Sequence, residues 1–130
     1  MVQLPKNVMD ALEKCKPFPI ATSSKDGVPN AGYVGAVKLL DNETLLVANN
    51  YMKKTLANIE ENPIAAIVVW DAENKESYQV KFTVENVHSG ELFEQFREEF
   101  KKYPVHSMLV MKPIEVYNSM RGKAAGERIA

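Results

Sequence analysis

Hydrophobic residues near the start of the chain recur at helical spacing. Val8, Leu12 and Cys15 fall on one helical face, so residues 5–15 are expected to form a short amphipathic helix. Pro17 follows and cannot continue a helix, so the helix should end before it. The first predicted element is therefore a single short helix.

Three strands joined by short turns are predicted next, at Ile20–Ser24, Asn30–Leu40 and Leu45–Ala48. The first two are separated by Lys25-Asp26-Gly27, in which Asp-Gly favours a tight hairpin turn. The last two are separated by Asp41-Asn42-Glu43. Connections this short favour an antiparallel meander over helical crossovers.

From Met52 the hydrophobic residues return to helical spacing. Met52, Leu56 and Ile59 share a helical face, and Asn62-Pro63 should end the helix. The next segment, Ile64–Trp70, is short, rich in β-branched residues and apolar throughout. Such a run suits a central strand that is buried on both faces.

The most regular alternation lies in Tyr78–Glu85, where the apolar residues should face the core and the polar residues the opposite side. A helix at 89–100 follows, with a stripe of Leu and Phe residues on one face. Val105–Tyr117 returns to strand character. Pro113 within it marks an edge or a bulge, because proline cannot donate a ladder hydrogen bond.

About six strands with two or three short helices over residues 1–130 predict a mainly β protein of one domain. A sheet of this size hides its edges by closing, so the expected architecture is a small closed or nearly closed antiparallel barrel. The length of 130 residues supports one domain, because a chain of this size buries roughly two-thirds of its unfolded surface while two halves would each be marginal.

Charge and composition narrow the partners. The chain has 16 Lys and Arg against 17 Asp and Glu, a net charge of −1, which leaves no strong field for nucleic acid or an anionic membrane. The apolar run Ile64–Trp70 is far shorter than the ~20 residues of a transmembrane helix. The chain shows no apolar stretch of a signal peptide at its start, and a lone Cys15 forms no intrachain disulfide. These features predict a cytoplasmic protein with no nucleic-acid or membrane partner.

Recognisable catalytic and metal-binding motifs are absent from the sequence. One cysteine and two histidines, His88 and His106, are too few for a structural zinc site, and neither HExxH nor CxxC occurs. No nucleophile elbow, Rossmann fingerprint or P-loop is present. No metal is expected, and no catalytic residue can be assigned.

The helix predicted after Met52 has its charges in an unusual order. Lys53 and Lys54 stand at its start and Glu60 and Glu61 at its end, whereas the helix dipole favours the reverse. A bound phosphate would remove the penalty, because it would meet free backbone N–H groups, both ammonium groups and the Thr55 hydroxyl. The alternative is that these are ordinary solvated charges. The order alone leaves both interpretations open.

Two further features are candidates for ligand contact. Gly32 and Gly35 interrupt a predicted strand, which is typical of a bulge, a barrel corner or a backbone that a ligand approaches closely. Gln79 lies on the polar face of the alternating strand, and its amide can both donate and accept hydrogen bonds.

Taken in order, these places resemble the FMN-binding split-barrel family, which includes pyridoxamine 5'-phosphate oxidase and the small bacterial FMN-binding proteins. The resemblance covers nearly the whole chain. The matching pieces are Ile20-Ala21-Thr22 with the Asp26-Gly27 turn, Leu46-Val47-Ala48-Asn49, Lys54-Thr55-Leu56-Ala57-Asn58-Ile59 with Asn62-Pro63, Gln79-Val80-Lys81, and Gly122-Lys123-Ala124-Ala125-Gly126-Glu127-Arg128-Ile129.

The resemblance implies a six-stranded antiparallel split β-barrel that forms a homodimer, with one FMN per subunit in the groove between subunits. In the family, a basic residue followed by Ser or Thr at this helix start holds the flavin phosphate, which carries over to Lys54 and Thr55 with Lys53 as a helper. The other cofactor contacts that the resemblance implies are Tyr33, Val34 and Gly35 of the second strand, Asn49 and Asn50 at a strand end, and Gln79.

The sequence also departs from the family pattern. Many relatives have glycine where this chain has Phe82, and the C-terminal end does not reproduce the substrate-binding segment of pyridoxamine 5'-phosphate oxidase, so vitamin B6 chemistry is not expected. Three functions are open. The first is an FMN-dependent oxidoreductase or electron carrier whose electron partner is a small molecule or a redox protein. The second is an F420-dependent reductase of the same fold, and the third is a cofactor-free dimeric binding module.

Overall fold

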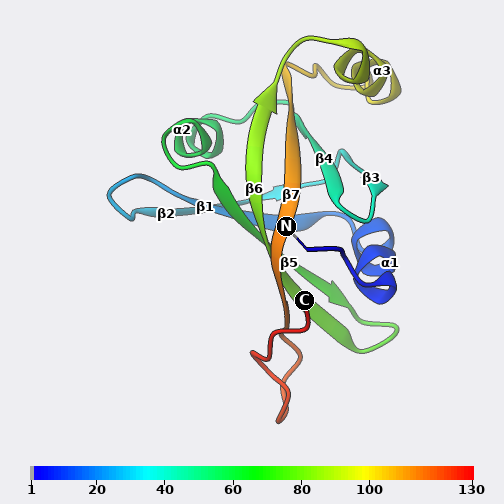
Figure 1. Cartoon of the computed structure of the whole chain (residues 1–130). Helices are drawn as coiled ribbons and strands as arrows, with labels where there is room; N and C mark the ends of the chain where they lie inside the picture. The colour runs from blue at the N-terminus through cyan, green and yellow to red at the C-terminus, as the bar shows by residue number, and fades with distance from the viewer. Residues whose placement is uncertain (1) are drawn as a thin grey trace.

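The computed structural model describes residues 2–130, which form seven strands and three helices (Figure 1). The helices are α1 (Lys6–Lys14), α2 (Lys54–Glu61) and α3 (Glu91–Glu99). The strands are β1 (Phe18–Ser23), β2 (Pro29–Val34), β3 (Val37–Asp41), β4 (Thr44–Asn49), β5 (Ile64–Asp71), β6 (Glu76–Val87) and β7 (Ser107–Asn118).

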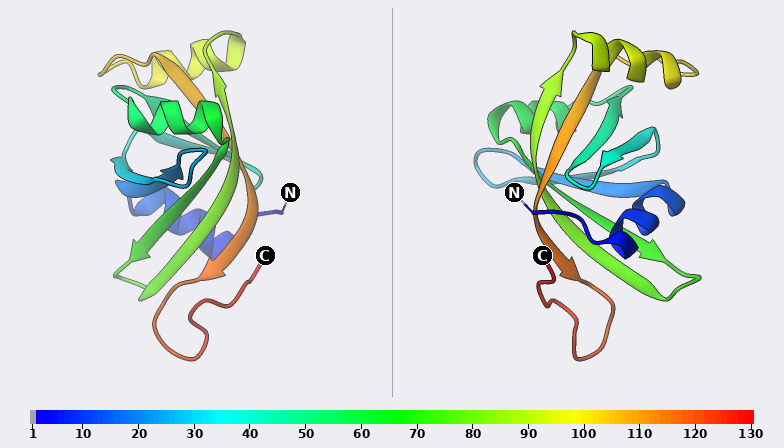
Figure 2. Two further views of the ribbon diagram at one scale, coloured as in Figure 1. Left: turned by 90° about the vertical axis from the view of Figure 1, so that its left-hand side faces the viewer. Right: turned by 45° about the vertical axis from the view of Figure 1, so that its right-hand side comes forward.

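The strands form one antiparallel sheet in the order β2-β1-β5-β6-β7-β4-β3. The sheet is strongly curved, and its two longest strands, β6 and β7, run side by side along the length of the molecule (Figure 2). None of the helices within residues 2–130 has the length and apolar character needed to cross a membrane. The predicted mainly β, split-barrel fold with short helices is confirmed.

The strand count differs from the expected six, because the segment predicted as one strand at Asn30–Leu40 is two strands. β2 pairs with β1 at one edge of the sheet and β3 pairs with β4 at the other, so the chain must turn between them. The turn lies at Gly35 and Ala36, where the Ala48 N–H donates to the Ala36 carbonyl at 2.9 Å. A β-carbon on Gly35 would lie 3.8 Å from the Pro17 side chain. The apolar run continues through this turn, so hydrophobic pattern could not locate it.

β4 is buried along its whole length because the molecule packs against both of its faces. Leu45 and Val47 face the main core inside the curved sheet. Leu46 faces the opposite way, into a second cluster that α3 closes with Phe93 and Phe96. This packing on two sides fixes the end of β4, from which the chain continues toward α2.

β5 lies between β1 and β6, but only one of its faces is buried. The prediction that it is buried on both faces is wrong. Ile64, Val68 and Trp70 on its outer face are 47%, 39% and 53% exposed. The outer face of β5 thus presents a row of exposed apolar side chains.

β7 carries a bulge opposite Phe82, which confirms the prediction made from Pro113. Lys81 pairs with Glu115 and Phe82 pairs with Pro113, so Ile114 is the extra residue on β7. Phe82 is fully buried at this point. The core therefore accommodates the Phe82 ring at the bulge.

A buried carboxylate connects α1 to the end of β5. Asp71 is 3% exposed and accepts hydrogen bonds from the backbone and side-chain nitrogens of Asn74 at 3.2 and 2.9 Å. The Lys14 ammonium, at the end of α1, lies 3.2 Å from Asp71 Oδ2. Burial by itself raises the pKa of Asp71, but the bonds from Asn74 and Lys14 outweigh it and hold the pKa below its ordinary value.

The variant Asp71→Asn is expected to lower the melting temperature at neutral pH and to lose this disadvantage in acid. Because the folded-state pKa of Asp71 is lowered, its carboxylate stabilises the fold above the unfolded pKa of about 3.9, and the stabilisation is lost as the pH falls through the folded value. Thermal melts of both proteins from pH 7 to pH 3 measure this. A gap between the two melting temperatures that does not narrow below about pH 4 would contradict it.

The C-terminal residues fold back along β7. The Ile129 N–H donates to the Val116 carbonyl at 2.8 Å, and the Val116 N–H donates to the Ala130 carbonyl at 3.1 Å. The Gly126 N–H donates to the Asn118 carbonyl at 2.7 Å and closes a loop that projects beyond the end of β7 (Figure 1). The tail is therefore an ordered addition to the part of β7 that β4 does not reach.

Candidate functional site

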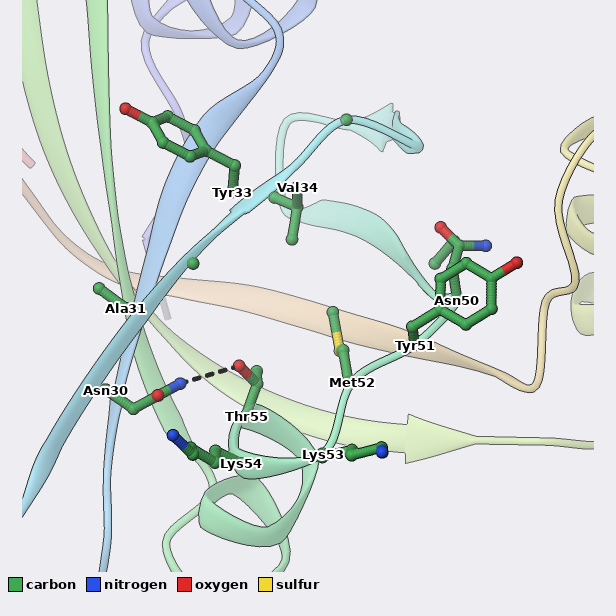
Figure 3. Close-up of a pocket in the computed structure, with 13 residues that line it drawn as sticks. Asn30, Ala31, Tyr33, Val34, Asn50, Tyr51, Met52, Lys53, Lys54 and Thr55 are labelled. Atoms are coloured by element: carbon green, nitrogen blue, oxygen red, sulfur yellow. Dashed lines mark hydrogen bonds between the residues drawn. The ribbon is translucent and has the colours of Figure 1, made fainter.

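A cavity of about 470 Å³ opens between β2 and the segment that joins β4 to α2 (Figure 3). One wall is an edge strand of the sheet, and the other is a loop that ends in a helix N-terminus. The volume is in the range of small-molecule and cofactor pockets. The lining consists of residues 30–35, 48 and 50–55.

The start of α2 forms the polar end of the cavity. Lys53, at the position before the helix, supplies no side-chain cap, so the first N–H groups of α2 have no capping side chain among the described residues. The helix has no acidic residue in its first turn and no basic residue in its last. The structure therefore places the two lysines at the N-terminus of a regular helix, where the free N–H groups and the helix dipole both favour an anion.

Thr55 and two lysines surround this helix end. Thr55 is 9% exposed, and its Oγ1 accepts a hydrogen bond from Asn30 Nδ2 of β2 at 3.1 Å. Figure 3 shows Lys54 extending toward Asn30, whereas Lys53 extends to the other side of the helix start. Both lysines are exposed. Of the two lysines, Lys54 is therefore the one that lies near the Asn30–Thr55 hydrogen bond.

Three asparagine side chains attach α2 to the β1–β2 hairpin. Asn30 Nδ2 donates to Thr55 Oγ1 and Asn58 Nδ2 donates to Thr22 Oγ1, both at 3.1 Å. Asn62 Nδ2 donates to a backbone carbonyl of β1 at 3.4 Å. A helix this short is not stable alone in water, so its packing and these bonds fix where it begins relative to β2.

The rest of the cavity wall is mainly apolar. Ala31, Gly32 and Val34 come from β2, and Met52 comes from the loop on the opposite side. A β-carbon at Gly32 would meet nothing within 4 Å, so the small residues leave the β2 backbone accessible. Tyr51 stands at the rim and is 70% exposed. A flat apolar group can therefore lie along β2 while an attached anion reaches the start of α2.

Most of the residues that were expected to contact a cofactor line this cavity: Tyr33, Val34, Gly35, Asn50, Lys53, Lys54 and Thr55. Asn49 does not. It is 5% exposed, its Nδ2 donates to Ser107 Oγ at 2.8 Å, and its Oδ1 accepts from the Met52 N–H at 3.0 Å. Asn49 thus supports the loop from behind. Asn50 is held by a bond from its Nδ2 to the Pro104 carbonyl at 2.7 Å.

Gln79 also lies outside the cavity, on the outer face of β6. It lines a separate cavity of about 450 Å³ with Lys81, Tyr117 and part of the C-terminal tail. The Tyr117 hydroxyl donates to Glu115 there, which raises the pKa of the hydroxyl and lowers that of the carboxyl. In the sheet, Gln79 stands directly opposite Val68 of β5. Within one chain, Gln79 is therefore part of the exposed outer face and not of the cavity beside α2.

Five lining residues were not predicted from the sequence: Asn30, Ala31, Ala48, Tyr51 and Met52. Tyr51 and Met52 lie between predicted contacts at Asn50 and Lys53, so their position in the chain could have indicated them. Asn30 gave no such signal, because its role depends on which helix packs against β2. No group of three His, Cys, Asp or Glu side chains within residues 2–130 is arranged to hold a metal ion.

The curved antiparallel sheet with its short helices is a split barrel. The family model described as pyridoxamine 5'-phosphate oxidase matches residues 4–123 of the chain. The chain belongs to this family.

Two curated proteins show how far the similarity extends. The uncharacterized protein MJ0282 of Methanocaldococcus jannaschii is 39% identical over 137 residues, which span 100% of this chain and 90% of that protein. A pyridoxine/pyridoxamine 5'-phosphate oxidase of Nostoc sp. is 36% identical over 72 residues, 55% of this chain and 33% of that enzyme. The similarity to the named oxidase is thus confined to about half of this chain.

Solved structures share the fold at lower identity. A putative pyridoxamine 5'-phosphate oxidase of Lactobacillus delbrueckii has a TM-score of 0.80 at 19% identity, over 88% of this chain and 93% of that one. An FMN-binding protein of Syntrophomonas wolfei has a TM-score of 0.73 at 17% identity, over 88% and 90%. A protein described as an F420 reductase has a TM-score of 0.66 at 21% identity, over 87% and 98%. At these identities the similarity shows the fold alone.

Proposed function

We propose that the chain binds FMN in the cavity beside α2 and serves as a flavin-dependent oxidoreductase or electron carrier. The proposal rests on one observation: the same cavity is lined by a basic, uncapped helix start and by an apolar strand. FMN has the matching parts, a phosphate at one end and a flat ring system at the other. The family membership and the Syntrophomonas FMN-binding protein of the same fold support this choice.

The residues at the polar end fit a phosphate. Lys54 and Thr55 would hold it through charge-assisted hydrogen bonds, with the free N–H groups of α2 beside them and Lys53 as a helper. Tyr33 and Val34 of β2 and the following Gly35 would lie against the ring, and Asn50 would supply a polar contact on the opposite wall. The protein thereby fixes the cofactor at both ends.

We expect the cofactor, and not an acid–base side chain, to supply the chemistry at this cavity. Of the described residues that line it, none is Asp, Glu or His, and two tyrosines and two lysines are the groups there that can exchange a proton. When bound, the flavin would supply hydride or electron transfer. The chain's own groups would bind the phosphate, orient the ring and exclude water from the face of the ring that lies on β2. The open rim beside Tyr51 leaves room for an electron partner, either a small molecule or a redox protein.

F420 is the second candidate cofactor. It also carries a phosphate and a flat ring system, so the same helix start fits it, and an F420 reductase shares the fold. FMN and F420 differ in the ring system, and F420 carries further groups beyond its phosphate. The start of α2 would contact the part that the two cofactors share.

We also propose that the chain is a homodimer that associates through the outer face of β5. Val68 and Trp70 are exposed there, and Gln79 stands beside Val68 in the same face. Tyr33 of β2 is 77% exposed and pairs with Pro19 of β1, and β1 lies beside β5. Because Tyr33 also lines the cavity, the outer face of the sheet extends to the edge of the cavity. A second copy on this face would cover the apolar side chains and could bring Gln79 of the partner subunit to the flavin.

The variant Val68→Glu is expected to weaken dimerisation roughly tenfold or more, because a carboxylate would be buried without a partner. Leu92→Glu is the matched control, since Leu92 is 38% exposed and Val68 is 39% exposed, but Leu92 lies on α3. Size-exclusion chromatography with light scattering measures both. A monomeric wild-type protein, or a Val68→Glu variant as dimeric as Leu92→Glu, would contradict the assignment.

The test of the function is a spectrum followed by titrations. The absorption spectrum of the purified protein separates oxidised flavin from deazaflavin. Titration of cofactor-free protein with FMN, riboflavin, F420 and haem then ranks the affinities. FMN binding that is much tighter than riboflavin binding supports the proposal, and tightest binding of F420 supports the second candidate. Colourless protein with no thermal shift from any of them would leave the dimeric binding module.

A further inference from the structure

We propose that Asn30 is a positioning residue that orients the Thr55 hydroxyl toward a phosphate and so determines preference for phosphorylated flavin. This inference rests on the proposed function, because it assigns a role within the same site. Asn30 belongs to none of the sequence motifs described above, and only the packing of α2 against β2 reveals it.

The bond from Asn30 restricts the directions in which the Thr55 hydroxyl can donate. A hydroxyl has one proton to donate and two lone pairs to accept with. Asn30 Nδ2 donates to Thr55 Oγ1 at 3.1 Å and occupies one lone pair, so the hydroxyl proton must point elsewhere. Within residues 2–130, Thr55 Oγ1 donates to no acceptor. Both side chains line the cavity, and Lys54 extends to the same side (Figure 3).

A phosphate at the start of α2 is the acceptor that this arrangement lacks. Its oxygens would accept the Thr55 proton, while the amide of Asn30 keeps the hydroxyl from turning toward β2. The side chain of Asn30 is only half-buried, so its amide also adds a positive edge to the polar end of the cavity. A flavin without phosphate gains nothing from either effect.

The chain contains a matched control for the structural part of this bond. Asn58 Nδ2 donates to Thr22 Oγ1, also at 3.1 Å, and this bond also joins α2 to the β1–β2 hairpin. Thr22 and Asn30 are directly paired in the sheet. Neither Asn58 nor Thr22 lines the cavity beside α2. Loss of the Asn58 bond should therefore affect stability without affecting phosphate recognition.

The experiment measures dissociation constants of FMN and riboflavin for six full-length proteins: wild type, Asn30→Ala, Asn30→Asp, Asn58→Ala, Thr55→Val and the double variant Asn30→Ala/Thr55→Val. Asn30→Ala should weaken FMN about fivefold and riboflavin less than about twofold. Asn30→Asp should weaken FMN more than Asn30→Ala does, because its carboxylate accepts the Thr55 proton and repels phosphate. Asn58→Ala should leave the ratio of the two constants unchanged. In a Thr55→Val background, Asn30→Ala should cause a much smaller further loss of FMN affinity than in the wild type, because only the direct effect of the Asn30 amide remains.

The outcomes separate the two proposals. If the wild type binds FMN no more tightly than riboflavin, the proposed function fails and the role of Asn30 fails with it. If the wild type prefers FMN but Asn30→Ala keeps that preference, or if Asn58→Ala lowers it equally, only the role of Asn30 is overturned. Should Asn30→Ala fold poorly, Asn30→Asp has nearly the shape of the native side chain, and an unchanged preference for FMN in that variant would overturn the role of Asn30 in the same way.

Discussion

Replacement of both Lys54 and Thr55 by alanine is expected to weaken FMN binding by about 2 kcal/mol or more, roughly thirtyfold in Kd. The double variant removes an ammonium and a hydroxyl from the polar end of the cavity and leaves the apolar wall along β2 unchanged. Riboflavin, which has no phosphate, should bind both proteins with similar affinity. Titration of cofactor-free protein, followed by quenching of flavin fluorescence, measures both constants.

A lysine at another helix start supplies the control for this prediction. Lys6 opens α1 much as Lys54 opens α2, but Lys6 is paired with Asp10 and lines no cavity described above. Lys6→Ala should leave FMN affinity unchanged. If the Lys54→Ala/Thr55→Ala protein bound FMN as tightly as the wild type, the assignment of the phosphate site to the start of α2 would be wrong.

The variant Phe82→Ala is expected to lower the free energy of unfolding by about 3–5 kcal/mol. Phe82 is fully buried at the bulge between β6 and β7, and its ring fills core volume that alanine would leave empty. Urea denaturation followed by circular dichroism measures the change.

The neighbouring residue tests whether the effect comes from the core or from the strand. Thr83 is exposed on the outer face of β6, so Thr83→Ala should change stability by less than about 0.5 kcal/mol. A loss below about 1 kcal/mol in Phe82→Ala would show that the core closes around the missing ring at little cost.

The sequence predicted the elements well where one period governs a whole segment. The alternation in β6 and the helical spacing in α1 each identify a buried face, because in both cases one side of the element meets the core. The same reasoning failed at β5, whose residues are apolar on both sides although only one side is buried. It also failed at Gly35, where the turn between β2 and β3 lies inside an apolar run.

The site was predictable where it is continuous in the chain. Lys53, Lys54 and Thr55 lie at one helix start, and their order of charge is visible without a structure. Asn30 could not be predicted, because its contact with Thr55 joins residues that are far apart in the chain. Gln79 illustrates the converse, since the resemblance indicates a cofactor contact but the fold of one chain places it elsewhere.

The alternation of burial along β5 has a consequence for reading natural variation and mutational scans. Ala65, Ile67 and Val69 face the core, so changes there should reduce the amount of folded protein in a cell. Their neighbours Val68 and Trp70 face outward, so changes there should leave abundance intact and, under the dimer that we propose, should appear only in assays of assembly. In a mutational scan of β5, loss of folded protein should therefore alternate with loss of assembly from one residue to the next.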